Sequence, residues 1–245
     1  MKSQFLFFIG LLILSTTGQS CAQQHPNAYN NEDFKINTVV VSHRPDLGVL
    51  VWEISVEGTA GKTVPVPAGQ LDGAPVLGYV FPTSLSPSDV GFDQTDGILA
   101  LALTSHPDFD DTPLWDENND TVFDNDGLVW HPHWVVLSED ERVSGGLAVK
   151  QFKKVDKSVV LPATNPGMPM YMDSPGFPVI TDKKTIRVVV PAYRMNYKTD
   201  FKYDGVSAFM KVNTSLEDKP MLGVYEVFSI ASGNLSLPYT VKSRP

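Results

Sequence analysis

Three histidines have the spacing that most clearly suggests chemistry. His131 and His133 are separated by one residue, so in a strand their side chains lie on one face, about 7 Å apart. His106 ends an earlier apolar segment and is the natural third imidazole. Three imidazoles suit Zn²⁺ or Cu²⁺ with an open position for water. Asp108 or Asp110 could supply a carboxylate ligand or orient an imidazole.

The acidic segment between His106 and His131 offers a second candidate site. Its oxygen-bearing side chains recur at every second or fourth position, at Asp116, Asn118, Asp120, Asp124 and Asp126. Ca²⁺ prefers six to eight oxygen ligands, which a loop of this composition supplies. The opening resembles an EF-hand, but Thr121 and Gly127 replace its glycine and its glutamate. The segment therefore predicts a calcium loop on a β scaffold; the alternative is an acidic turn held by side-chain-to-backbone hydrogen bonds, without an ion.

A methionine cluster is the third candidate. Met168, Met170 and Met172 alternate with Pro169 and Tyr171. Thioethers bind the soft ion Cu(I), and they are also ordinary packing material beneath a proline-rich loop. The sequence leaves both interpretations open.

Several other classes of chemistry lack their sequence signatures. The chain has no Gly-x-Ser-x-Gly motif, no phosphate-binding glycine loop and no dinucleotide fingerprint. Its single cysteine, Cys21, leaves no disulfide within the chain. The formal net charge of -9 argues against nucleic-acid binding, which requires a basic surface.

The N-terminus predicts export. Lys2 precedes an apolar run over 5–14 and a small, polar run up to Cys21, which is the order of a signal peptide. Gly18-Gln19-Ser20-Cys21 resembles a bacterial lipoprotein box, which implies a lipid anchor on Cys21 as the contact with a membrane. Cleavage after Ala22 is the alternative. We expect the protein in the cell envelope as a lipoprotein, or secreted.

The elements that must position these residues are predicted to be strands. Residues 49–56 alternate strictly, with Leu50, Trp52, Ile54 and Val56 on one face, which is typical of a half-buried strand. Further strands are expected at 39–41, 63–66, 76–81, 98–103, 128–137, 146–152, 186–190, 206–212 and 224–230. No segment carries a helical apolar stripe over three turns, so the predicted fold is all-β, an antiparallel sandwich or barrel.

The predicted organisation is an export segment at 1–21, a polar tether at 22–33 and a single all-β domain at 34–245. A proline-rich stretch at 155–179 is expected to form an irregular excursion. Two consecutive small sandwiches are the alternative.

Two functions follow from these residues. The first is an exported, lipid-anchored β-rich binding or scaffold protein, whose acidic loop takes a divalent cation, calcium above all. The second is a zinc- or copper-dependent enzyme, or a copper-handling protein, centred on His106, His131 and His133. Nothing in the sequence identifies a substrate or a protein partner.

Overall fold

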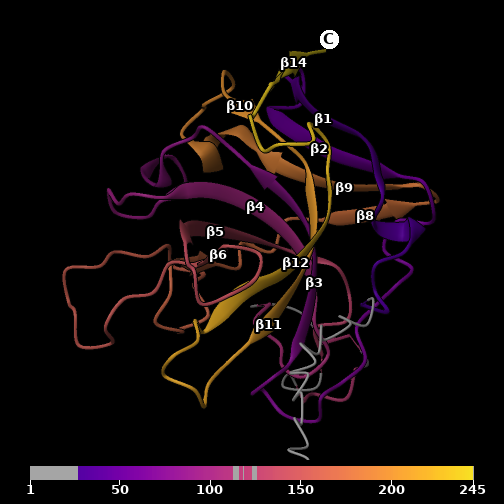
Figure 1. Cartoon of the computed structure of the whole chain (residues 1–245). Coiled ribbons are helices and arrows are strands. Elements are labelled where there is room, and N and C mark those ends of the chain that lie inside the picture. The colour runs from indigo at the N-terminus through magenta and orange to yellow at the C-terminus, as the bar shows by residue number, and fades with distance from the viewer. Residues whose placement is uncertain (1–26, 113–115, 118, 123–125, 245) are drawn as a thin grey trace, which may run out of the picture.

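The computed structural model describes residues 27–112, 116–117, 119–122 and 126–244 (Figure 1). The predicted export segment and Cys21 lie outside these residues, as do Asn118 and Asp124 of the acidic segment. Within the described part, none of the helices has the length and the apolar character needed to cross a membrane.

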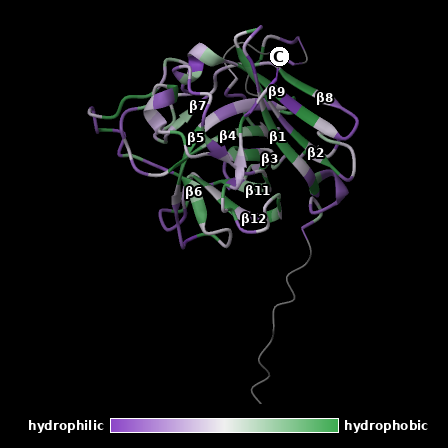
Figure 2. Ribbon diagram, turned by 90° about the horizontal axis from the view of Figure 1, so that it is seen from above, coloured by the Kyte–Doolittle hydropathy of each residue, from purple (hydrophilic) through white to green (hydrophobic). Residues whose placement is uncertain are grey.

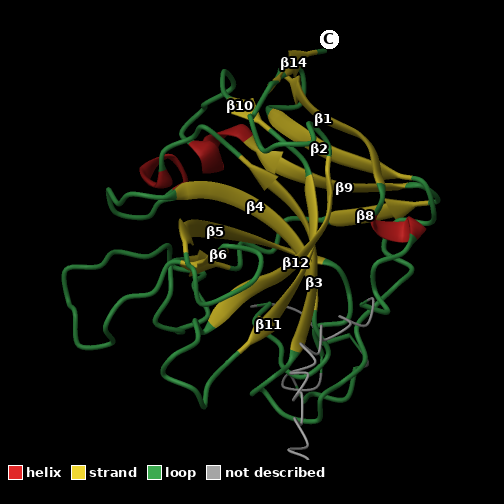
Figure 3. Ribbon diagram, viewed as in Figure 1, coloured by secondary structure: helices red, strands yellow, loops and turns green. Residues whose placement is uncertain are grey.

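The predicted all-β class is confirmed. Strands and loops make up nearly all of the described chain, and its helical turns are short 3₁₀ helices (Figure 3). These are η1 (Glu32–Phe34), η2 (Pro87–Val90) and η3 (Ala192–Met195).

A closed, six-stranded antiparallel barrel is the larger element of the fold. Its strands follow the order β4-β3-β11-β12-β6-β5, and β5 pairs with β4 to close the ring. They are β3 (Pro75–Pro82), β4 (Ile98–Ser105), β5 (His131–Glu139), β6 (Leu147–Val149), β11 (Val206–Val212) and β12 (Leu222–Ile230). The two-residue strand β7 (Met172–Asp173) adds to the free side of β5.

A second sheet packs against one side of this barrel. Its order is β14-β1-β2-β9-β8, with β14 parallel to β1 and the other neighbours antiparallel. Its strands are β1 (Ile36–Arg44), β2 (Val49–Val56), β8 (Val179–Asp182), β9 (Thr185–Pro191) and β14 (Lys242–Ser243). A separate two-stranded ribbon joins β10 (Lys202–Tyr203) to β13 (Tyr239–Thr240).

Alternation along the barrel strands divides the apolar side chains between two clusters. In β4, Leu99, Leu101 and Leu103 face outward and pack with Trp52 and its neighbours on the second sheet. The intervening Ala100 and Ala102 face the barrel interior. Strands buried on both faces carry apolar residues on both, which is why apolar residues concentrate in the strands and hydrophilic ones in the loops (Figure 2).

Two predicted strands differ from the structure. Residues 63–66 form no strand, because Pro65 and Pro67 lack backbone N–H donors and Val64 and Val66 are exposed. The segment 146–152 contains only the short strand β6. The proline-rich stretch at 155–179 is irregular except for β7 and an isolated bridge at Met170.

Candidate metal centre

A hairpin of β4 and β5 positions the three histidines. The strands pair with Ala102 opposite His133 and Thr104 opposite His131, and His106 follows the end of β4 directly. Because side chains alternate, His131 and His133 lie on the same face of β5 as Val135, while Trp134 packs in the outer cluster. Two neighbouring strands thus bring three imidazoles to one end of the barrel.

At Pro132, β5 has a neighbouring strand on one side only. It pairs there with β4, whereas its pairs with β6 and β7 begin at Trp134. A proline is tolerated in a strand where one side is locally unpaired. The imidazoles are nevertheless buried, with 2–4 % of each residue exposed.

Four potential ligand atoms converge on one point. The Nε2 atoms of His106, His131 and His133 each lie 3.4 Å from Oδ1 of Asp111. All four side chains offer ligand atoms within 4.8 Å of one another, and this is the one such group found among the described residues. A tetrahedral zinc ion with bonds of about 2.0–2.1 Å separates its ligands by about 3.4 Å. The three distances to Asp111 match that geometry, whereas the 2.8 Å between Nε2 of His106 and Nε2 of His131 is shorter than a tetrahedral site requires.

The outward nitrogens of the rings are all hydrogen-bonded. Nδ1 of His106 donates to the Phe109 carbonyl oxygen at 2.9 Å, and Nδ1 of His131 donates to the Val129 carbonyl oxygen at 2.6 Å. Nδ1 of His133 lies 3.0 Å from the Ser174 hydroxyl. A carbonyl can only accept, so in the neutral rings of His106 and His131 the lone pair is on Nε2, towards the centre. Metal-bound histidines are typically oriented by such partners.

Two of these lone pairs come unusually close. Nε2 of His106 and Nε2 of His131 are 2.8 Å apart, a distance that two acceptors do not adopt without a positive charge between them. A proton on one of these two rings would form a hydrogen bond between the two nitrogens only. Oδ1 of Asp111 is buried and accepts no hydrogen bond from any described group. A metal ion would satisfy all four atoms at once.

The electrostatics of the group also favour a cation. Burial opposes ionisation of Asp111, but the facing imidazoles of His133 and His106 bring the pKa of its carboxyl well below the ordinary value. Burial lowers the pKa of His133 to about 3, which leaves its ring neutral. Burial also acts against a charge on His131, yet the Asp111 carboxylate beside it raises the pKa of that ring. The group thus combines an ionised carboxylate with a neutral His133 ring.

The carboxylate in this group is neither of the two expected from the sequence. Asp108 turns away and accepts the backbone N–H groups of Ala68 and Gly69. Asp110 accepts the N–H of Thr112, and burial raises the pKa of its carboxyl. Asp111 is the inward residue because the chain turns tightly after His106.

That turn is built from Phe109 and Gly127. The Phe109 ring stacks on the His106 imidazole with centroids 4.1 Å apart and planes 6° from parallel. Gly127 adopts φ +102° and packs so closely that a Cβ there would collide with the carbonyl oxygens of His106 and Phe109. Its own carbonyl accepts the His106 N–H at 2.8 Å. Only glycine fits this approach without strain.

The structure does not bring the acidic segment into a comparable group. The Asp116 carboxylate accepts the N–H groups of Asp120 and Thr121, and Asp120 accepts the N–H of Val122. Asp126 is buried, with Oδ2 unpaired among the described residues, but it belongs to no candidate metal group there. Asp124 and Asn118 lie outside the described residues. Calcium in this loop stays a prediction.

The methionine cluster lies beside the histidines. Met168, Met170 and Met172 line a narrow cavity together with His106 and His133, and Asp111 also faces it. Asp111 and Met168 in addition border a larger cavity of about 530 Å³ on the outer side, where Asp110 and Thr112 are neighbours. The candidate centre thus borders this cavity through Asp111.

Comparison of the chain with protein-family models, curated sequences and solved structures found no match.

Proposed function

We propose that this protein binds one transition-metal ion, zinc in the first instance, through His106, His131, His133 and Asp111. The ion is its functional centre. One observation carries the proposal: four buried lone-pair atoms on three separate segments point at one another, and no group among the described residues satisfies them together. Three imidazoles and one carboxylate form a donor set that zinc accepts in tetrahedral geometry.

The ion would serve as a Lewis acid. Two ligands stand on β5 and a third directly follows β4, so the imidazoles are held by the barrel. Asp111 belongs to a loop and borders the outer cavity. Because the four protein ligands would fill a tetrahedral site, a polar group from that cavity would have to displace Asp111 or bind as a fifth ligand, and the ion would then polarise it.

An equilibrium titration tests this proposal. Chelator-treated protein, produced without a metal-affinity tag, is titrated with Zn²⁺ and then with Co²⁺, whose absorption bands report coordination geometry. We expect one ion per chain and the intense bands of tetrahedral Co²⁺. His43→Ala, on β1 and outside the group, is the matched histidine control. Equal affinities for wild type and His131→Ala would refute the proposal.

Copper handling is a second candidate, and the position of the methionines supports it. Three thioethers and two of the imidazoles line the same narrow cavity, which combines the ligand types that Cu(I) and Cu(II) prefer. Replacing Met168, Met170 and Met172 together with leucine separates the two functions. Loss of Cu(I) binding with Zn²⁺ binding retained supports copper handling, whereas unchanged Cu(I) affinity removes it.

We also propose that the protein acts outside the cytoplasm, in the envelope or secreted. The support is the sequence of residues 1–21 with Cys21, not the fold. Metabolic labelling with a fatty acid, compared between wild type and Cys21→Ala, tests the lipid anchor.

A further inference from the structure

An apolar cavity lies inside the barrel, next to the metal centre. Its volume is about 100 Å³, and its walls come from β3, β4, β5, β6, β11 and β12. Small side chains such as Ala102 and Ala208 leave the space open. An apolar cavity of about 150 Å³ in another protein stays dry and takes up benzene. This cavity is therefore suited to a small apolar molecule or part of one.

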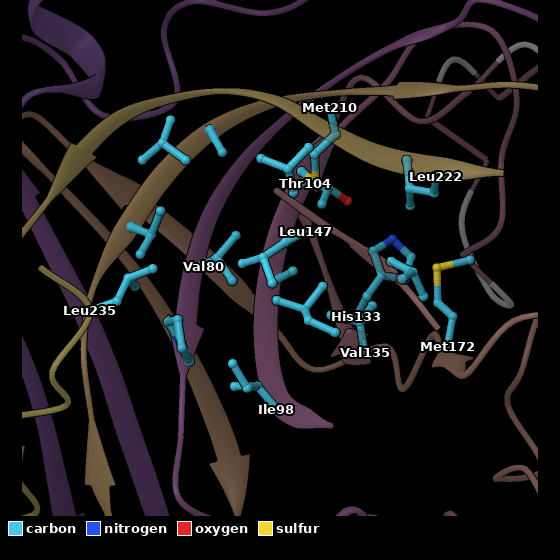
Figure 4. Close-up of a pocket in the computed structure, with 18 of the residues that line it drawn as sticks. Val80, Ile98, Thr104, His133, Val135, Leu147, Met172, Met210, Leu222 and Leu235 are labelled. Atoms are coloured by element: carbon cyan, nitrogen blue, oxygen red, sulfur yellow. The ribbon is translucent and has the colours of Figure 1, made fainter. Parts of the chain in front are cut away.

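Only two of the lining residues are polar, Thr104 and His133. Figure 4 shows His133 on one side of the cavity and Leu235 on the opposite side, with Thr104 on the wall between Met210 and Leu147. Thr104 and His133 also line the narrow cavity that continues to His106 and Asp111. The polar part of the wall therefore faces the metal centre.

The Thr104 hydroxyl is the second, independent observation. Thr104 is 4 % exposed, and its Oγ1 is buried without a hydrogen-bond partner among the described residues. A buried hydroxyl without a partner is unfavourable, and valine would fill the same space without that cost. Its neighbours on this face of β4, Ala100 and Ala102, are apolar. The hydroxyl is explained if a ligand supplies the missing partner.

We propose that the barrel interior binds a small apolar molecule with a single oxygen at one end, an alcohol, aldehyde or ketone, whose oxygen bonds Thr104. The hydrocarbon part lies against the apolar walls, and the oxygen points towards His133 and the metal centre. This inference deepens the proposed function by naming the substrate class of the same site. Binding of the ligand itself requires only the cavity and Thr104.

The test compares two small probes of nearly the same shape, 1-butanol and n-pentane, because the cavity is smaller than one that takes up benzene. Each is titrated into wild type and Thr104→Val and followed by chemical-shift changes of the cavity methyl groups. We expect wild type to bind both probes. The valine variant should bind 1-butanol about tenfold more weakly, the effect of one hydrogen bond, with its n-pentane affinity within about twofold.

A cavity-filling variant provides the second arm. Ala208→Leu places a larger side chain in the space and should abolish binding of both probes. If that variant does not fold, Ala102→Leu fills the space from β4 instead. The inference is overturned if wild type binds neither probe, or if Thr104→Val leaves the affinity for 1-butanol unchanged.

All titrations are made on zinc-loaded and on chelator-treated protein, so that the two proposals fail separately. Zinc binding without probe binding contradicts the inference and leaves the metal centre standing. Probe binding with the expected Thr104 effect but without any bound zinc supports the ligand site and contradicts the proposed function.

Discussion

The histidine group and the acidic segment that follows His106 are neighbours in sequence, but the polar atoms of their side chains have different kinds of partner. The histidine group places four unsatisfied lone-pair atoms against one another on a barrel hairpin. In the acidic segment, Asp116 and Asp120 accept backbone N–H groups of their own loop. Glu117 likewise accepts the N–H groups of Gly127 and Val129. These three carboxylates thus accept backbone N–H groups, whereas the Nε2 atoms of the histidines face one another and Asp111.

The two regions differ in how their potential ligand atoms are satisfied, not in how many they offer. Carboxylates in an exposed loop are satisfied by local N–H donors and by solvent, whereas buried lone pairs fixed on strands have no such alternative. The predictions below test this contrast, from the largest expected effect to the smallest.

Removing one strand-borne ligand should have the largest effect. His131→Ala or His133→Ala leaves two imidazoles and one carboxylate, so we expect Zn²⁺ affinity to fall by more than about 100-fold, the upper range for removing only an outer partner. Competition with a chromogenic chelator measures it. His43→Ala should bind as wild type does, and a similar loss in that control would show that the effect is not local.

Replacing the Asp111 carboxylate should distinguish this residue from its sequence neighbour Asp110. Asp111→Asn keeps the size but removes the charge, and we expect a loss of at least tenfold in Zn²⁺ affinity. Asp110→Asn is the matched control, because Asp110 is the sequence neighbour and lies outside the group. Equal losses in both variants would contradict the assignment of Asp111.

Gly127→Ala should disturb the centre without replacing a ligand. Its positive φ and the contact with His106 and Phe109 make a methyl group there costly, by about 1–3 kcal/mol in the free energy of unfolding. Chemical denaturation of the zinc-free protein measures the cost. Gly146 also has positive φ but open space around it, so Gly146→Ala separates backbone strain from the collision.

Ser174→Ala should weaken metal binding moderately. The hydroxyl orients His133 through Nδ1, and loss of an orienting partner lowers metal affinity by about 10–100-fold. Ser174→Thr retains the hydroxyl and should restore most of the affinity. A purely structural role would lower the melting temperature of the zinc-free protein as well, and we expect that temperature to change little.

The smallest effect is expected in the acidic segment. Asp116→Ala removes two hydrogen bonds to exposed backbone and should cost about 1 kcal/mol or less of stability, with zinc content unchanged. Elemental analysis and a melting curve measure both. Loss of stoichiometric calcium in this variant would break the comparison and favour the calcium loop.

The ligands that lie on or next to strands could be predicted from the sequence, because side chains in a strand alternate between its two faces. The His131-x-His133 spacing fixes one face, and the apolar segment before His106 pairs with it in the hairpin. The carboxylate could not be predicted in this way. Asp108, Asp110 and Asp111 look alike in sequence, and the choice among them depends on the Phe109 stack and the backbone of Gly127, which are contacts across the loop.

The fold could be predicted to a similar extent. Alternating apolar segments and the lack of helical stripes indicated an antiparallel all-β protein. Closure of the barrel also requires the β4–β5 pairing and the short strand β6, which carry little sequence signal of their own. The cavity beside Thr104 follows from how the six strands close, and no local pattern encodes it.

Elemental analysis of the protein as purified, without an affinity tag, tests the central claim most directly. We expect one zinc or copper ion per chain in wild type, and none in His131→Ala or His133→Ala under the same conditions. Stoichiometric calcium alone, or a transition metal retained by both variants, would contradict the assignment of His106, His131, His133 and Asp111 as the functional metal centre.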